Sequence, residues 1–149
     1  MRRACACITP SQLRVNTTIV LLAWGMLSAL ILSFFFETVI VASFGLTLFI
    51  LVVVVAPVVE ETTKGAPILL GYTHPNPFLT PVLVGFGFGA TEFFVQAITG
   101  GSAFVFAPLI HMLFMVPYAI LRKNPRIALL FAMFLHATWN LFVYTGGGV

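Results

Sequence analysis

The sequence predicts an all-α fold, a polytopic bundle of about five transmembrane helices that forms one membrane domain over residues 1–149. Of these residues, 60% are hydrophobic and only 7% are charged, whereas soluble domains carry about 25% charged residues. So few charged side chains cannot cover the surface of a soluble globule. The apolar residues also gather into stretches of about 20, the length that a helix needs to cross a bilayer.

Five apolar segments predict the membrane-spanning helices, at residues 17–36, 45–70, 79–99, 103–121 and 127–145. The breaks between the last four segments read GYTHPNPF, TGGSA and RKNPR, and they are rich in turn-forming residues. The first segment is too long for the apolar core of a signal peptide, and no small-residue cleavage site follows it cleanly. We therefore expect it to remain as the first span, with a short turn after it at Glu37.

The second segment could start anywhere between residues 38 and 46. A start at residue 38 would carry Glu60 about 33 Å along the helix axis, to the far membrane surface, whereas a start near Gly45 leaves it about 22 Å down. The apolar residues that follow Lys64 favour the longer, tilted helix that starts near Gly45. Pro57 predicts a kink in this helix, because a proline removes one backbone hydrogen bond.

The charged residues predict orientation rather than a nucleic-acid partner, because the net charge of +3 is small and the basic side chains are scattered. By the positive-inside rule, the N-terminus lies in the cytoplasm and the C-terminus outside. Cys5 and Cys7 are too close in sequence for an ordinary disulfide, and we expect two reduced thiols on a cytoplasmic tail. In a five-span arrangement, all the Lys and Arg residues lie on or towards one side: Arg2, Arg3, Arg14, Lys64, Arg122, Lys123 and Arg126.

Strongly polar side chains inside the predicted spans are the candidate functional residues. An ionised side chain at the centre of a bilayer costs about 2.5–3.5 kcal/mol, and such groups usually face the bundle interior and pair with one another. Three Glu and two His on four successive spans form a dense set for so small a bundle, whereas His74 in THPNP is expected to be an ordinary loop residue. The set comprises Glu60, Glu61, Lys64, Glu92, Gln96, His111, His136 and Asn140.

The spacing of these residues predicts how they meet. Glu60 and Lys64 are four residues apart, so they share a helix face and can pair, while Glu61 points about 100° away and is free to meet another helix. Gly85 and Gly89 form a G-x-x-x-G pattern that lets a neighbouring helix approach closely. Glu92 lies on the same face of this helix as Gly85 and Gly89, so that contact directs its carboxylate at the partner helix. His136 and Asn140 are again four residues apart.

The set suits hydrolysis of an amide within the membrane. Glu60 and Glu61 cannot both be comfortably ionised in hydrocarbon, so one of them is suited to act as a general base on water. Two His and one Glu with an open position form a known catalytic zinc arrangement, and His111 and His136 would be the ligands if Zn²⁺ is used. Alternatively, His and Asn side chains donate hydrogen bonds to a developing oxyanion.

Four motifs occur in order on successive spans: EETTK at 60–64, GFGFGATE at 85–92, His111, and HATWN at 136–140. In this order the chain resembles the PrsW family of intramembrane proteases, over roughly residues 54–142. That family is related to the CAAX-processing and bacteriocin-processing membrane proteases and to the scaffold subunit of gamma-secretase. The CAAX-type families carry Arg in place of Lys64 and favour Phe in place of Ala107, and this difference favours the PrsW branch.

The resemblance implies an intramembrane endopeptidase that cleaves a membrane-anchored protein or peptide. It implies that Glu60 or Glu61 is the activating carboxylate, and that the site is completed by Glu92, His111, His136 and Asn140. Two other functions remain open for the same residues. The first is a non-catalytic membrane scaffold of the same fold, and the second is a proton-coupled or ion-coupled membrane protein in which Glu and His form a relay.

The one-sided distribution of basic residues generates a topology prediction. A reporter fused after Val149 should be active outside the cytoplasm, and the same reporter inserted in the RKNPR loop should be active inside it. Paired alkaline phosphatase and fluorescent-protein fusions measure both compartments. The reversed pattern of activities would contradict the five-span assignment.

Overall fold

The protein is described here by a computed structural model that covers most of the chain. Within the described residues every regular element is helical and there is no strand, which confirms the all-α prediction. Some predictions concern positions outside the described residues, namely those for Cys5, Cys7, Glu37 and most of the TGGSA break. The structure describes residues 10–33, 47–99 and 105–147, and positions 35, 39, 42, 43 and 45.

Five helical columns follow one another along the described residues, and each overlaps one predicted segment. The fit is closest for the third column, which spans the predicted residues 79–99. Two columns continue into π-helical turns at their C-terminal ends, and the second contains such turns within it. The columns are α1 (Pro10–Leu27) with η1 (Ser28–Ser33); α3 (Leu48–Ile50), η2 (Leu51–Val55) and α4 (Ala56–Leu69); α5 (Leu79–Thr99); α6 (Ala107–Ile120); and α7 (Pro125–Phe142) with η3 (Val143–Gly147).

The second column runs unbroken from Leu48 to Leu69, because the backbone angles at its internal junctions are right-handed helical. It begins at Thr47, whose hydroxyl accepts a hydrogen bond from the backbone N–H of Ile50 at 3.4 Å. This start agrees with the longer helix predicted from near Gly45. The disturbance predicted at Pro57 takes the form of the wide π-helical turns of η2 directly before it, a common adjustment in helices at functional sites.

Two of the described helices are long and apolar enough to cross a membrane, at Leu79–Ile98 and Pro125–Gly146. The stretches Asn16–Ile31 and Ala107–Ile120 are apolar but shorter. By length and composition, the structure is therefore compatible with membrane association through two helices, which is fewer than the five spans predicted.

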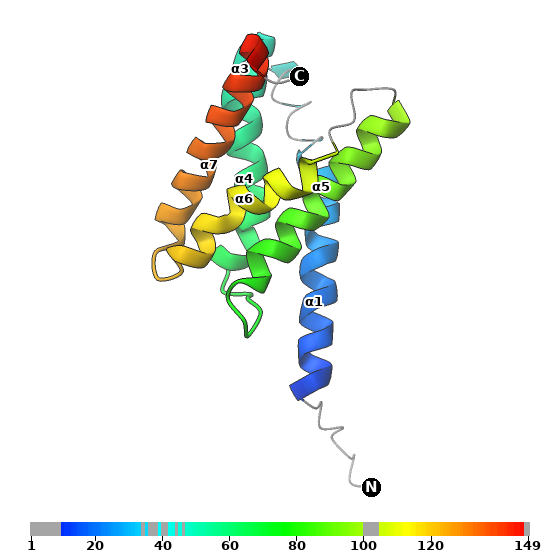
Figure 1. The fold of residues 1–149 in the computed structure, drawn as a ribbon, viewed down its shortest axis with the longest axis vertical. Coiled ribbons are helices and arrows are strands. Elements are labelled where there is room, and N and C mark those ends of the chain that lie inside the picture. Colours follow the sequence, from blue (N-terminus) through cyan, green and yellow to red (C-terminus); the bar gives the residue numbers. More distant parts are fainter. Residues whose placement is uncertain are drawn as a thin grey trace, which may run out of the picture.

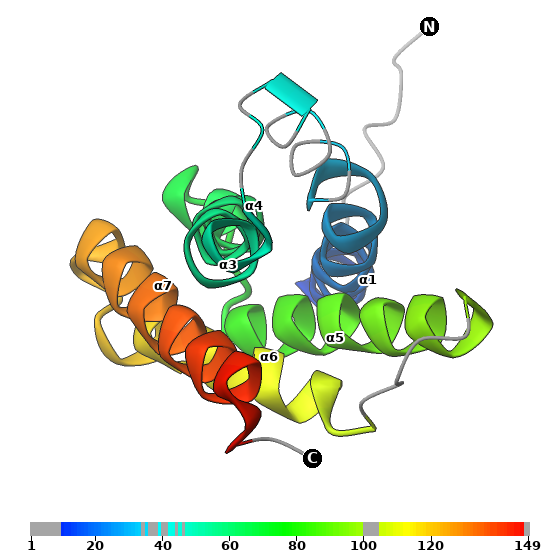
Figure 2. The same cartoon turned by 90° about the horizontal axis from the view of Figure 1, so that it is seen from above.

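α5 lies at the centre of the arrangement, packed against α1 and against α6, while α7 packs against α6 and α4. Figure 1 shows α1, α4 and α7 running roughly along the long axis of the molecule, with α5 crossing in front of α1, and in Figure 2 α5 runs beside the nearly end-on α1. The buried apolar cluster between these helices is small and consists of Leu21, Val84, Met115, Tyr118, Ala128 and Ala132.

Glycines on α5 bring its backbone into contact with both neighbouring helices. A Cβ atom on Gly85 would lie 2.7 Å from the carbonyl oxygen of His111, and one on Gly89 would lie 2.5 Å from the carbonyl oxygen one turn earlier in α6. On the opposite face, a Cβ atom on Gly87 would lie 2.6 Å from the carbonyl oxygen of Leu22 in α1. The close approach predicted for the G-x-x-x-G pattern thus occurs, and its partner is the helix that carries His111.

Gly85→Ala should destabilise the protein, although alanine is the better helix former. The added methyl group meets backbone atoms of α6, which cannot rotate away, so the two helices must separate. Overpacking of this kind costs about 1–3 kcal/mol. Thermal unfolding in detergent micelles measures the loss, and Ile98→Ala on the exposed face of the same helix is the control. A Gly85→Ala protein at least as stable as the parent would show that α5 and α6 are not in backbone contact.

Candidate active site

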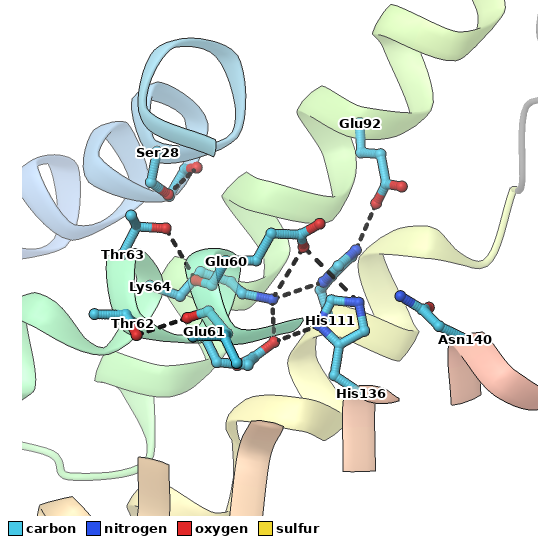
Figure 3. A network of polar contacts seen from close by, with 12 residues as sticks. Ser28, Glu60, Glu61, Thr62, Thr63, Lys64, Glu92, His111, His136 and Asn140 are labelled. Atoms are coloured by element: carbon cyan, nitrogen blue, oxygen red, sulfur yellow. Dashed lines mark hydrogen bonds and ion pairs between the residues drawn. The ribbon is translucent and has the colours of Figure 1, made fainter. Parts of the chain in front are cut away.

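α4 contributes two carboxylates and one ammonium to a polar cluster in the interior (Figure 3). Lys64 Nζ lies 2.5 Å from Glu61 Oε1 and 3.7 Å from Glu60 Oε2. The side chains of Lys64 and Glu61 are fully buried. The predicted pairing of Lys64 with Glu60 is therefore present but is the longer of the two contacts. The flexible side chain of Lys64 reaches both Glu60, four residues earlier, and Glu61, three residues earlier, and Glu61 is the closer partner.

α7 supplies His136, which meets both carboxylates of α4. Its Nδ1 lies 2.8 Å from Glu61 Oε1, within hydrogen-bonding distance, while its Nε2 lies 3.9 Å from Glu60 Oε2. Since an ionised carboxylate only accepts hydrogen bonds, Nδ1 carries the proton and Nε2 presents a lone pair towards Glu60. Glu61 thus meets another helix, as its direction on α4 predicted.

α6 and α5 complete the cluster with His111 and Glu92. His111 Nε2 lies 2.5 Å from Glu92 Oε2, and His111 Nδ1 lies 2.9 Å from Lys64 Nζ. An ammonium only donates hydrogen bonds, so His111 Nδ1 accepts and Nε2–H donates to Glu92. The other oxygen of Glu92 accepts a hydrogen bond from Gln96 Nε2 at 3.0 Å. Both ring nitrogens of His111 are therefore engaged.

Two phenylalanine rings pack against the polar groups. The ring of Phe88 lies under the ammonium of Lys64, with 4.4 Å between Nζ and the ring centroid, which is within the range of a cation–π interaction. The ring of Phe114 stacks on His136 with 4.6 Å between centroids. Sequence reasoning missed both residues. Their spacing in the sequence could have predicted these contacts, because Phe88 is one turn before Glu92 and Phe114 is nearly one turn after His111, so each shares a helix face with a site residue.

Asn140 lies one turn beyond His136 but bonds elsewhere. Its amide Nδ2 donates to the backbone carbonyl of Val52 at 2.8 Å, and Figure 3 shows it beside the cluster rather than within it. His74 belongs to the loop between α4 and α5, as predicted, but it is buried and it organises the turn. Its Nδ1 accepts a hydrogen bond from the backbone N–H of Asn76 at 2.9 Å.

The charges of the cluster do not balance if all carboxylates are ionised and both imidazoles are neutral. Glu60, Glu61 and Glu92 then carry three negative charges against the single positive charge of Lys64. Buried charges are tolerated only when they are compensated, so an additional proton or cation would stabilise the buried part of this cluster. Glu61 Oε2 is buried and accepts no hydrogen bond from the described residues. Such an oxygen costs about 1–3 kcal/mol unless it binds a proton, a water or a cation.

One ligand atom from each of Glu60, His111 and His136 lies within 4.8 Å of the other two, so this group could hold a metal ion. His136 fits that role well, because a metal-binding imidazole usually donates its other N–H to a carboxylate, here that of Glu61. His111 fits less well, because its two nitrogens already contact Lys64 and Glu92. A metal at this position would have to displace one of these two contacts.

No protein-family model, curated protein or solved structure matches this chain. The likeness to the PrsW family therefore remains a prediction that rests on the motifs. The geometry adds an independent observation, because five of the six predicted site residues come together and the sixth, Asn140, bonds a backbone carbonyl at the edge of the same cluster.

The ion pair between Lys64 and Glu61 should be strongly coupled. Lys64→Met leaves buried carboxylates without their cation, and Glu61→Gln leaves the ammonium short of an anion. Breaking a buried pair from one side costs about 3–5 kcal/mol. The double variant should recover part of that loss, and a double-mutant cycle on unfolding free energies measures the coupling. The same cycle with Glu60→Gln should give a smaller coupling because of its longer distance. Additive effects for Lys64 and Glu61 would contradict the contact.

Proposed function

We propose that the chain is an integral membrane protein with five spans, a cytoplasmic N-terminus and an external C-terminus, and that it acts as an intramembrane endopeptidase. Support for the membrane setting comes from the outward faces of α5, α6 and α7. Their large apolar side chains are more than half exposed and would be covered by lipid: Phe94, Ile98, Leu113, Ile120, Leu130 and Phe134. The substrate would be a membrane-anchored protein or peptide.

One observation carries the enzymatic proposal, the convergence of carboxylates and imidazoles from four helices on one point of an apolar interior. Each buried ionisable group lowers stability unless it is compensated. Packing alone would be satisfied by apolar residues of similar volume at these positions. Groups that are retained at such a cost inside a membrane are usually functional.

Glu60 and His136 form the part of the cluster best suited to activate a water molecule. Their facing atoms are 3.9 Å apart, too far for a direct hydrogen bond but close enough for one water to bond both. Such a water would donate one hydrogen to Glu60 Oε2 and the other to His136 Nε2, with an oxygen lone pair left for attack. The two groups would be held in place by Lys64 and Glu61.

In the reaction, the water oxygen attacks the carbonyl carbon of the scissile amide while Glu60 takes the water proton. The tetrahedral intermediate then collapses as the carbon–nitrogen bond breaks. The proton held by Glu60 passes to the leaving amine nitrogen, and the products are a carboxylic acid and an amine. His111 and Glu92 take no proton in this scheme. His111 accepts a hydrogen bond from Lys64 and is itself held by Glu92, and Lys64 keeps the carboxylates of α4 in place.

A zinc ion, if bound, would be held by Glu60, His111 and His136 and would supply Lewis-acid activation of water. The contacts of His111 with Lys64 and Glu92 favour the metal-free scheme, because the ammonium already provides positive charge beside the carboxylates. Metal analysis of purified protein, followed by assays with and without a chelator, separates the two schemes. Loss of activity on chelation and its return with Zn²⁺ would favour the metal.

A proton-conducting membrane protein is the second candidate, favoured by the continuity of the polar contacts. They run from Glu92, whose side chain is 36% exposed, through His111 and Lys64 to the buried Glu61 and His136. A chain of this kind can relay protons. Pyranine-loaded proteoliposomes test this function. Proton flux that is lost in His111→Ala, without any peptide cleavage, would favour the relay over the protease.

Glu60→Gln and His136→Ala should each lower proteolysis by about 10²–10⁴-fold, the usual contribution of a positioned acid–base group. Single-span peptides labelled with a fluorophore and a quencher, reconstituted with the protein in liposomes, provide the assay. His74→Ala should retain turnover, because that imidazole lies in the loop between α4 and α5. Melting temperatures of all three variants show that they are folded. Unchanged cleavage by folded Glu60→Gln would exclude the proposed base.

A further inference from the structure

Two prolines interrupt the hydrogen bonding of the helical column that carries Glu60, Glu61 and Lys64. Pro57 precedes these residues and Pro67 follows them. A proline has no backbone N–H, so the carbonyl that would have bonded to it loses its donor. In an apolar interior, such a carbonyl must find another partner. For each proline, another group must therefore donate a hydrogen bond to the carbonyl that lacks its intrahelical donor.

For Pro67, the carbonyl is that of Thr63, because α-helical bonding joins a carbonyl to the N–H four residues later. The indole Nε1–H of Trp24, from α1, donates to this oxygen at 2.8 Å. Thr63 is the residue directly before Lys64. The first helix of the bundle is thus bonded to the backbone of the site helix at the residue before Lys64.

For Pro57, the carbonyl is that of Val52, because the column has π-helical turns at this point. The backbone N–H of Ala56 donates to Leu51, five residues earlier. In the same pattern the next carbonyl, that of Val52, would require an N–H at position 57. Asn140 Nδ2, from α7, donates to this oxygen instead at 2.8 Å.

We propose that Trp24 and Asn140 are positioning residues, each of which supplies the hydrogen bond that a proline removes from the site helix. Together they tie the column to α1 at Thr63, within the EETTK motif, and to α7 at Val52, eight residues before that motif. This sets the rotation and depth of Glu60 and Glu61 relative to His136. Asn140 then acts on the backbone of the site helix, which replaces the direct role in the site predicted from the sequence. The consequence for turnover rests on the proposed function, whereas the bonding itself does not.

The test exploits the fact that alanine in place of proline restores a backbone donor. Trp24→Phe, which keeps an aromatic ring but removes the N–H, should lower the melting temperature by about 2–4 °C. In a Pro67→Ala background, Thr63 regains its intrahelical partner, and Trp24→Phe should then cause little or no further loss. Asn140→Leu should behave in the same way towards Pro57→Ala.

The crossed pairs are the matched controls. Pro57→Ala should not rescue Trp24→Phe, and Pro67→Ala should not rescue Asn140→Leu, because each proline frees a different carbonyl. Rescue by either proline without discrimination, or equal losses in all backgrounds, would overturn the proposal. Should a proline variant not fold, benzothienylalanine at position 24 replaces the indole N–H by sulfur in the parent chain. An unchanged melting temperature with that residue would also overturn the proposal for Trp24.

Turnover provides a readout that general destabilisation does not move. At a temperature where all variants are folded, Trp24→Phe and Asn140→Leu should lower kcat with little change in KM, and only the matching proline variant should restore kcat. If the parent protein cleaves no peptide, the proposed protease function fails, but the melting-temperature cycles still decide the bonding. If cleavage occurs and kcat is not restored by the matching proline variant, the positioning role fails while the protease stands.

Discussion

The buried contact between Lys64 and Glu61 is the interaction on which the rest of the site depends. The ammonium of Lys64 contacts the carboxylates of α4, the imidazole of His111 on α6 and the ring of Phe88 on α5. No apolar side chain could make these contacts together, because carboxylates and an imidazole lone pair both require a donor. Removing the cation would leave the carboxylates of Glu60 and Glu61 uncompensated on one buried face of α4. One side chain therefore joins three helices both electrostatically and sterically.

The glycines of α5 give this interaction its geometry. Backbone contact at Gly85 and Gly89 sets the spacing between α5 and α6 at its minimum, and this spacing brings Glu92 within reach of His111. Bulkier residues at these positions would move the imidazole away from Lys64 as well. The polar contacts are strong in the apolar interior only at short distance, so the close helix packing and the ion pair support each other.

Much of the fold and of the site could be predicted from the sequence. Residues 79–99 were predicted as they are observed, because an apolar run bounded by turn formers determines its own limits. The meeting of Glu61 with another helix followed from its direction on its own helix, about 100° away from Glu60. The closer pairing of Lys64 with Glu61 could not be predicted, since residues three and four apart are equally reachable on a helix. The roles of Trp24 and Asn140 depend on which helix lies beside which carbonyl, and local sequence does not contain that information.

The different ways in which the helices are joined have a consequence for how a long substrate could reach the carboxylates. α1, α5 and α6 touch through their backbones at glycines, so they form a wall that cannot open without breaking many contacts at once. α4 packs mainly against α7 and η1, and individual side-chain hydrogen bonds tie it to α1, α6 and α7. Such bonds can break one at a time. For the proposed protease, we therefore expect a substrate entrance at the borders of α4, the helix that carries Glu60 and Glu61.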